Sequence, residues 1–455
     1  MLNTLLCGVL ALNLQAAPPA PADAPPPPVA TEAASAAQKG GKKAGDEGVR
    51  FVWRDHPSFR VGRWLRLDFI GKFQWDARDP GDKPIKFDTT EFHRARLGVE
   101  GEIFRHIQFN IERELTEREI QAPIPTLKTI GTIPQTTAKR STKEWKDVYV
   151  DVNYTDMAQV QAGKFKIPFG LEQLTGILNV DFVYRSLSAV YLAPGRDKGV
   201  MVHGEFLDGA LGYAAGGFQH DGVNSRSRLV AGGGRTVAGR VTFRPLKPIK
   251  TANLDRLEIG SAVAVSDLSD ESLFPNGLRA RTVVSQYAYF EPVFVKGRRK
   301  RFETDLDWFV GPLGVRGEFT DVRDDRDRQG FGDQALPAAR ARAWYVSGTY
   351  VLTGEDKRRP VEPKHWYGAV EVAGRLERLR FDSVSSTGEP LRNPRARAIL
   401  PNSDTVLTAA TNWYLNRWVK LQVEGIRERL LDVERSPTLD DSPFWSSVFR
   451  VQIGI

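Results

Sequence analysis

The sequence has almost no cysteine and no long apolar run, and both absences narrow the possible classes of protein. Cys7 is the single cysteine among 455 residues, so disulfides, thiol catalysis and cysteine-ligated metal sites are excluded. The six histidines never fall at a metal-ligand spacing such as H-x-x-x-H, and we expect neither a metal nor a cofactor. After the N-terminal segment, no run of about 18 apolar residues occurs, which excludes a transmembrane helix.

A strong excess of one charge sign is also missing. The chain carries 64 Lys and Arg residues against 56 Asp and Glu, a formal charge of +8 spread over its whole length. A nucleic-acid-binding protein gathers its basic residues on one domain or face, and no such segregation is present. We therefore expect no nucleic-acid partner.

The first 58 residues have the composition of an export signal followed by a linker. Leu5 to Leu14 form an apolar stretch, and Ala16 is a small residue of the kind found before a signal-peptidase cut. We predict a cleaved signal peptide at 1–16 and a Pro/Ala-rich disordered periplasmic linker at 17–58, because this tract cannot bury a core. An exported chain without a transmembrane helix is either a soluble periplasmic protein or a transmembrane β-barrel.

From residue 59 to residue 455, apolar and charged side chains alternate in repeated segments of about ten to fourteen residues. In the first of them, Leu67 and Phe69 share one face while Arg66 and Asp68 share the other, the period-two pattern of a strand with two different faces. Strands of soluble proteins also alternate but are mostly about 5 to 6 residues long, whereas these match a tilted span of a bilayer. The pattern favours a transmembrane barrel.

Strand number follows from the connections, which are alternately short and long, as in outer-membrane barrels. A direct count finds about seventeen candidate strands, but an even number is required if both termini are periplasmic. We predict that Leu278–Glu291 belongs to one long outer loop, which leaves about sixteen strands. A barrel of that size encloses a water-filled channel.

One stretch resembles a known family. It reads Val160-Gln-Ala-Gly-Lys-Phe-Lys-Ile-Pro-Phe-Gly170, then Leu-Glu-Gln-Leu-Thr175, Tyr184-Arg-Ser and Ala193-Pro-Gly-Arg-Asp-Lys-Gly-Val-Met-Val-His-Gly204. These residues resemble the phosphate-selective porin O and P family. The resemblance implies an all-β fold, a transmembrane antiparallel β-barrel of about sixteen strands in the outer membrane of a Gram-negative bacterium. It also implies a homotrimer surrounded by outer-membrane lipid and an inward-folded constriction loop, here at about 167–197.

The selectivity of a channel comes from the radius of its narrowest part and the charges that line it. Arg and Lys side chains in the lumen would attract small anions such as phosphate, with Arg offering a planar set of donors to oxyanions. For each of them the alternative is an ion pair with a lumen carboxylate such as Asp147 or Glu112. The cations that we predict to line the pore and contact anions are Arg196, Lys164, Lys166, Arg185, Lys198, Arg94, Arg96 and Arg66.

The predicted function is that of an outer-membrane porin for passive uptake of small anions, with phosphate or polyphosphate as the solute that the resemblance suggests. The alternative is a general diffusion porin with weak selectivity or a different solute. A barrel enzyme using His203 with Ser186 or Ser188 is disfavoured, because no G-x-S-x-G-like elbow is present. We therefore do not expect an enzyme.

Overall fold

The computed structural model divides into two units, Met1–Gly45 and Asp46–Ile455, and the fold described below is that of the second. The predicted signal peptide at 1–16 and most of the predicted linker lie outside the described residues. The structure describes residues 48–53, 56–81, 89–119, 139–141, 144–224, 234–249, 255–268, 275–357, 359–384, 386–436 and 442–455.

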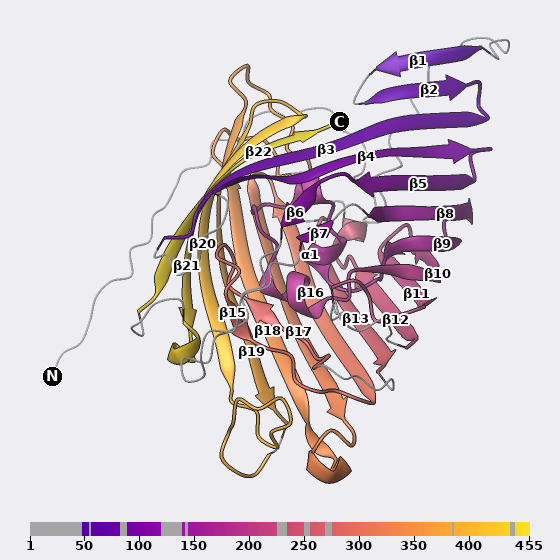
Figure 1. Cartoon of the computed structure of the whole chain (residues 1–455). Helices are drawn as coiled ribbons and strands as arrows, with labels where there is room; N and C mark the ends of the chain where they lie inside the picture. The colour runs from indigo at the N-terminus through magenta and orange to yellow at the C-terminus, as the bar shows by residue number, and fades with distance from the viewer. Residues whose placement is uncertain are drawn as a thin grey trace. The chain divides into compact units, whose positions relative to one another are not determined.

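Sixteen strands of the described chain form one closed antiparallel barrel (Figure 1), which confirms the predicted fold class. Each pairs with the next along the chain, and the last pairs with the first from Ser447 opposite Asp79 to Gly454 opposite Lys72. The strands are β3 (Leu65–Asp79), β4 (Thr90–Ile103), β5 (Ile107–Glu114), β8 (Trp145–Thr155), β9 (Ala158–Lys166), β10 (Arg196–Phe206), β11 (Leu211–Phe218), β12 (Thr236–Phe243), β13 (Glu258–Asp267), β16 (Arg298–Val310), β17 (Leu313–Arg326), β18 (Leu336–Val351), β19 (Ala369–Ser383), β20 (Asn402–Tyr414), β21 (Val419–Leu430) and β22 (Phe444–Gly454).

The barrel is inverted relative to a water-soluble protein, because its apolar side chains face outward and its charged ones inward. On β16, Phe302 is 45% exposed while its neighbours Arg301 and Glu303 are at most 2% exposed. On β21, Val423 is 54% exposed beside the buried Glu424. A soluble sheet buries its apolar face, so this arrangement is the one expected in lipid and excludes the soluble periplasmic alternative.

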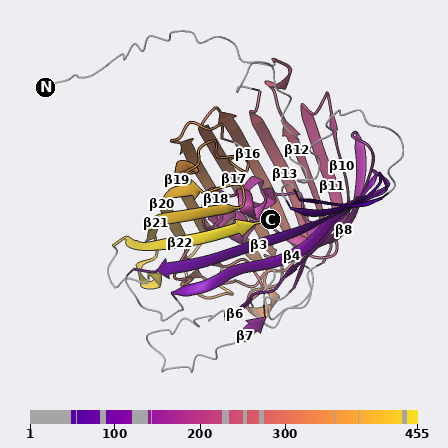
Figure 2. The same cartoon turned by 90° about the horizontal axis from the view of Figure 1, so that it is seen from above.

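Two long connections fold into the barrel from the end that carries the long loops. The first is the loop 167–195, which contains α1 (Leu171–Leu174), η1 (Ile177–Asn179) and the π-helical turn η2 (Ser188–Leu192). Figure 2, a view from above, shows this segment inside the ring of strands. Backbone N–H groups of the loop donate to carboxylates on the inner wall. The N–H of Glu172 donates to Glu318 (3.2 Å), that of Val183 to Glu424 (2.5 Å) and that of Leu187 to Glu377 (2.6 Å).

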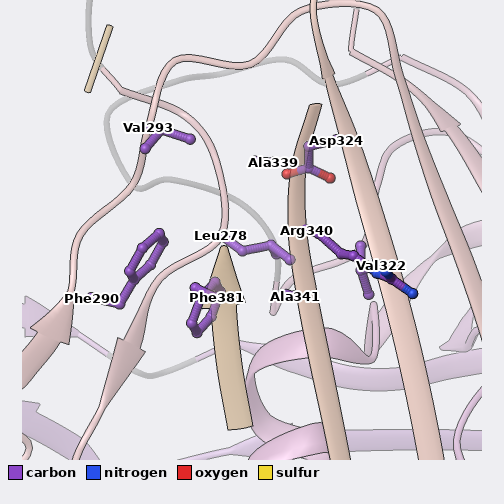
Figure 3. Close-up of a pocket in the computed structure, with 9 residues that line it drawn as sticks. All are labelled: Leu278, Phe290, Val293, Val322, Asp324, Ala339, Arg340, Ala341 and Phe381. Atoms are coloured by element: carbon purple, nitrogen blue, oxygen red, sulfur yellow. The ribbon is translucent and has the colours of Figure 1, made fainter. Parts of the chain in front are cut away.

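The second inward segment, 275–297, lies between β13 and β16 and contains only the short strands β14 (Ala280–Arg281) and β15 (Ala288–Phe290). The prediction that Leu278–Glu291 does not span the membrane is confirmed. The alternation pattern does not predict that this loop enters the lumen, where it packs with the first loop in a hydrophobic cluster. Figure 3 shows Phe290 stacked on Phe381 of β19, with ring centroids 4.0 Å apart, beside a cavity of about 10 Å³.

An additional hairpin, β1 (Val49–Trp53) and β2 (Pro57–Val61), precedes the barrel and continues the sheet from the first residues of β3. The predicted boundary between linker and barrel at residues 58 and 59 is therefore wrong, because strand structure begins at Val49 and the barrel itself at Leu65. The period-two alternation of apolar and polar residues already starts at Val49, within the tract that we assigned to the linker on its overall composition.

The remaining elements lie in connections. None of the described helices is long and apolar enough to cross a membrane. These elements are β6 (Glu117–Glu119), β7 (Lys139–Ser141), η3 (Lys247–Ile249), η4 (Phe331–Asp333) and η5 (Val433–Arg435).

Candidate functional site

The two halves of the inner wall differ in how much water can reach them. On β16–β22 the inward loops cover the charged side chains, and Arg299, Glu303 and Arg450 are at most 1% exposed. On β3 and β4 the inward side chains of Lys72 and Arg94 keep 23% and 15% of their surface exposed. The accessible part of the lumen therefore lies along the wall that begins at β3.

This accessible wall carries a network of ion pairs. The Lys72 ammonium lies 2.5 Å from a Glu112 carboxylate oxygen, and the Arg96 guanidinium reaches both Glu112 (3.1 Å) and Glu114 (2.7 Å). Arg94 lies farther from Glu114, at 3.9 Å. Arg94 and Arg96 thus face the lumen as predicted, but Arg96 is half of a wall ion pair, the alternative that we had weighed for each cation.

The same network continues to the base of the loop 167–195. Arg196 at the start of β10 holds Asp147 with two hydrogen bonds of 2.9 and 2.6 Å. The Lys166 ammonium donates to the backbone carbonyls of Leu174 (2.9 Å) and Thr175 (3.2 Å) at the end of α1. These two cations therefore fix the loop where it leaves and rejoins the wall.

Arg185, on the loop itself, forms no ion pair with a carboxylate among the described residues. Its Nη2 donates to the carbonyl of Thr175 at 2.7 Å, whereas its Nη1 is buried and has no hydrogen-bond partner among the described residues. Burial lowers the pKa of Arg185 to about 10; Glu172 opposes that shift, while Arg196 and Arg316 add to it. The pKa direction shows that the positive charge is disfavoured there, and an anion beside Nη1 would relieve this.

We define the basic cluster as the cations of this wall and loop that are connected by ion pairs or by short-range electrostatics. It contains eight cations and the four carboxylates that pair with them, so cations outnumber carboxylates in the cluster. The cations are Lys72, Arg94, Arg96, Lys146, Lys164, Lys166, Arg185 and Arg196, and the carboxylates are Glu112, Glu114, Glu144 and Asp147.

The structure places the two predicted pore-lining lysines Lys164 and Lys198 differently. They stand opposite each other in the β9–β10 register, on the same face as the exposed Val148 and Val200. Lys198 is exposed on that outward apolar face, so the prediction of a lumen position is wrong for it. The Lys164 ammonium, near the end of β9, lies 3.7 Å from Glu144 of the basic cluster. Strand alternation shows which residues share a face but not which face is the inner one.

The predicted Arg66 lies near the N-terminal end of β3, with its Nε 2.9 Å from Asp68. Sequence reasoning missed Lys72 and Lys146 as site residues. Lys72 could have been found, because it has the same parity as Arg66 and Asp68 in one uninterrupted strand. Lys146 could not, because the register shifts between β5 and β8 just before it.

One group of side chains brings metal-ligand atoms together. Oxygen and nitrogen atoms of Asp76, Glu91 and His93 lie within 4.8 Å of one another. Both Asp76 oxygens, however, accept hydrogen bonds of 2.6 Å from Arg450. A cation would have to displace this bidentate arginine, so the arrangement fits a metal poorly.

The residues considered for a barrel enzyme do not assemble. His203 lies 3.0 Å from Asp151 on the wall, while the Ser188 hydroxyl donates to Glu318 at 3.0 Å. Among the described contacts, none joins His203 to Ser186 or Ser188. The nucleophile and base that we considered therefore have separate structural partners.

Comparison with known proteins decides the family. The profile of "Phosphate-selective porin O and P" matches residues 68–452, from β3 to β22. The chain belongs to the phosphate-selective porin O and P family. No curated protein matches the sequence. The porin is thus a channel protein of the Gram-negative outer membrane, and its β1–β2 hairpin precedes the matched region.

Solved structures show the same fold at low sequence identity. A loop-deleted OmpT of Vibrio cholerae matches with a TM-score of 0.52 and 11% identity, covering 86% of this chain and 99% of that one. OmpF of Salmonella typhi, solved with daunomycin, gives 0.52 and 8%, covering 86% and 98%. DcaP of Acinetobacter baumannii, an outer membrane channel, gives 0.50 and 12%, covering 87% and 99%. At these identities the similarity shows the porin fold alone.

Proposed function

We propose that this porin conducts small anions passively, and that the loop 167–195 forms the constriction where they are selected. The observation that carries the proposal is Arg185, which presents a buried, unpartnered guanidinium nitrogen on the loop. It faces a wall with a net excess of cations. The charge of this guanidinium would attract a permeating anion and repel a cation.

Oxyanions are the solutes that fit this chemistry best. A guanidinium offers planar N–H donors that match phosphate or carboxylate oxygens, and the family description points to phosphate. We propose phosphate as the first solute to test.

A general diffusion porin is the second candidate, and one observation favours it. Arg96 and Arg196 already hold wall carboxylates, so much of the positive charge is compensated before any solute arrives. Under this alternative the cluster shapes the pore and gives only weak selectivity.

We infer further that the chain is exported through a cleaved signal peptide at 1–16 and assembles as a homotrimer. Export agrees with the apolar stretch at Leu5–Leu14 and with the outer-membrane location of the family. Sequencing the N-terminus of protein isolated from outer membranes tests the cleavage, and the mass of the detergent-solubilised protein tests the trimer.

Planar bilayer recordings test the proposed function. We expect a reversal potential that indicates anion preference in a KCl gradient, and a concentration-dependent block of chloride current by phosphate. Anion preference without block would support an anion porin for another solute. A reversal potential near zero would favour general diffusion, and cation preference would refute the proposal.

A further inference from the structure

The hairpin of β1 and β2 has two chemically different faces. Val49, Phe51 and Trp53 of β1 point to one side, and the register places Phe51 opposite Phe59 of β2. The ring centroids of Phe51 and Phe59 are 5.1 Å apart, and Phe59 lies 5.9 Å from Phe69 of β3. One face of the hairpin is therefore an aromatic row across three neighbouring strands.

The opposite face carries a row of arginines. Arg50 stands opposite Arg60, and Arg60 stands opposite Arg66 of β3. This face continues the inner face of β3, on which Arg66 lies 2.9 Å from Asp68.

The aromatic face has no cover from the described chain. Phe51 is 54% exposed and Trp53 61%, far more than the rings of a folded core. Through Phe69 this face is continuous with the outward apolar surface of the barrel, which faces lipid. Continuity with the lipid-facing surface identifies phospholipid as the occupant.

The outer edge of β1 limits how deep the hairpin can lie in the membrane. In the described chain β1 pairs only with β2, so its other edge presents unpaired backbone groups. Open sheet edges do not occur in the hydrocarbon region, where no water can satisfy them. The headgroup zone meets both requirements, because Trp residues are enriched there and water remains available.

The hairpin also lies at the correct end of the barrel. The turn from β2 to β3 contains Trp64, whose ring contacts Phe104 in the short turn between β4 and β5, with centroids 5.8 Å apart. Short turns mark the periplasmic end of outer-membrane barrels. We propose that the β1–β2 hairpin is an amphipathic anchor in the periplasmic interface of the outer membrane, with its aromatic face in phospholipid.

Depth-dependent fluorescence quenching tests this placement in the full-length porin. In a Cys7→Ser background, an environment-sensitive dye is attached at Phe51→Cys on the aromatic face or at Arg60→Cys on the opposite face. A third variant, Val237→Cys, reports a lipid-facing position of β12, where the native side chain is 67% exposed. The proteins are reconstituted in vesicles of phosphatidylethanolamine with phosphatidylglycerol, and unchanged channel conductance verifies folding. If Phe51→Cys impairs folding, Trp53→Cys replaces it.

We expect nitroxide lipids to quench the dye at position 51 at least half as strongly as at position 237, and an aqueous quencher to reach position 60. Equal access of the aqueous quencher to positions 51 and 60 would overturn the proposal. So would shielding of position 51 from both quenchers, with disulfide-linked dimers on oxidation, because a second copy would then cover this face.

Discussion

Replacing Arg185 by Gln should reduce the preference of the channel for anions more than replacing any exposed charged residue of the outer wall. Gln keeps a donor for the Thr175 carbonyl, which Arg185 contacts at 2.7 Å, so the loop can retain its position. What is removed is one positive charge whose Nη1 has no partner among the described residues.

The size of the effect follows from Coulomb's law. A unit charge about 4 Å from a permeating ion contributes about 1 kcal/mol in a water-like medium, and more where the constriction excludes water. That energy corresponds to about a fivefold change for the anion, and repulsion of a cation changes by a similar factor in the opposite direction. We therefore expect the chloride-to-potassium permeability ratio to fall at least about fivefold in Arg185→Gln.

The assay is the reversal potential across a planar bilayer with a KCl gradient near 0.1 M, where the Debye length of about 10 Å preserves the interaction. The matched control is Lys198→Gln, which removes one positive charge from the outward face of β10 and should leave the ratio unchanged. An unchanged ratio in Arg185→Gln with normal conductance would refute the assignment of Arg185 to the selectivity region. A shift in Lys198→Gln would contradict the outward position of that lysine.

Two further predictions concern stability and the loop. Asp221 accepts hydrogen bonds from Arg299 and Arg301, both at 2.5 Å. The substitution Asp221→Asn should therefore lower the free energy of unfolding in detergent by about 3 kcal/mol, because it leaves these buried guanidinium groups partly uncompensated. Burial opposes ionisation of Asp221, yet the arginines hold its pKa below the usual range. The contribution of Asp221 to the free energy of unfolding is therefore complete above about pH 4 and is lost as pH falls through the lowered folded-state pKa. Urea titrations at several pH values should show this dependence in the unaltered porin and not in Asp221→Asn. Glu424→Ala removes the carboxylate that accepts the Val183 N–H at 2.5 Å. The loop should then move more, which should increase the current noise of the open channel. Noise equal to that of the unaltered porin would show that the other carboxylates hold the loop without Glu424.

Much of the barrel was predictable because strand alternation is a local property. Residues such as Leu67 and Asp68 differ in polarity at every second position, and a strand places such neighbours on opposite faces whatever surrounds it. The assignment of Leu278–Glu291 to a loop also needed only counting, because a closed antiparallel barrel with both ends on one side has an even number of strands.

The candidate site was predictable only in part. Arg94, Arg96, Arg185 and Arg196 were correctly associated with the wall or the loop, since each follows from strand parity or from the position of the loop in the chain. Lys198 was placed on the wrong face, because strand alternation does not show which of the two faces is the inner one.

By itself, the amino-acid sequence determined the secondary structure, the approximate number of strands and the polarity of their two faces, because these depend on residues close together in the chain. The tertiary structure alone decided which cations remain compensated. Glu318, Glu377 and Glu424 accept N–H groups from a loop more than a hundred residues away, and these bonds hold Arg185 on that loop inside the barrel. Such pairings depend on distances across the closed barrel, which local periodicity does not contain.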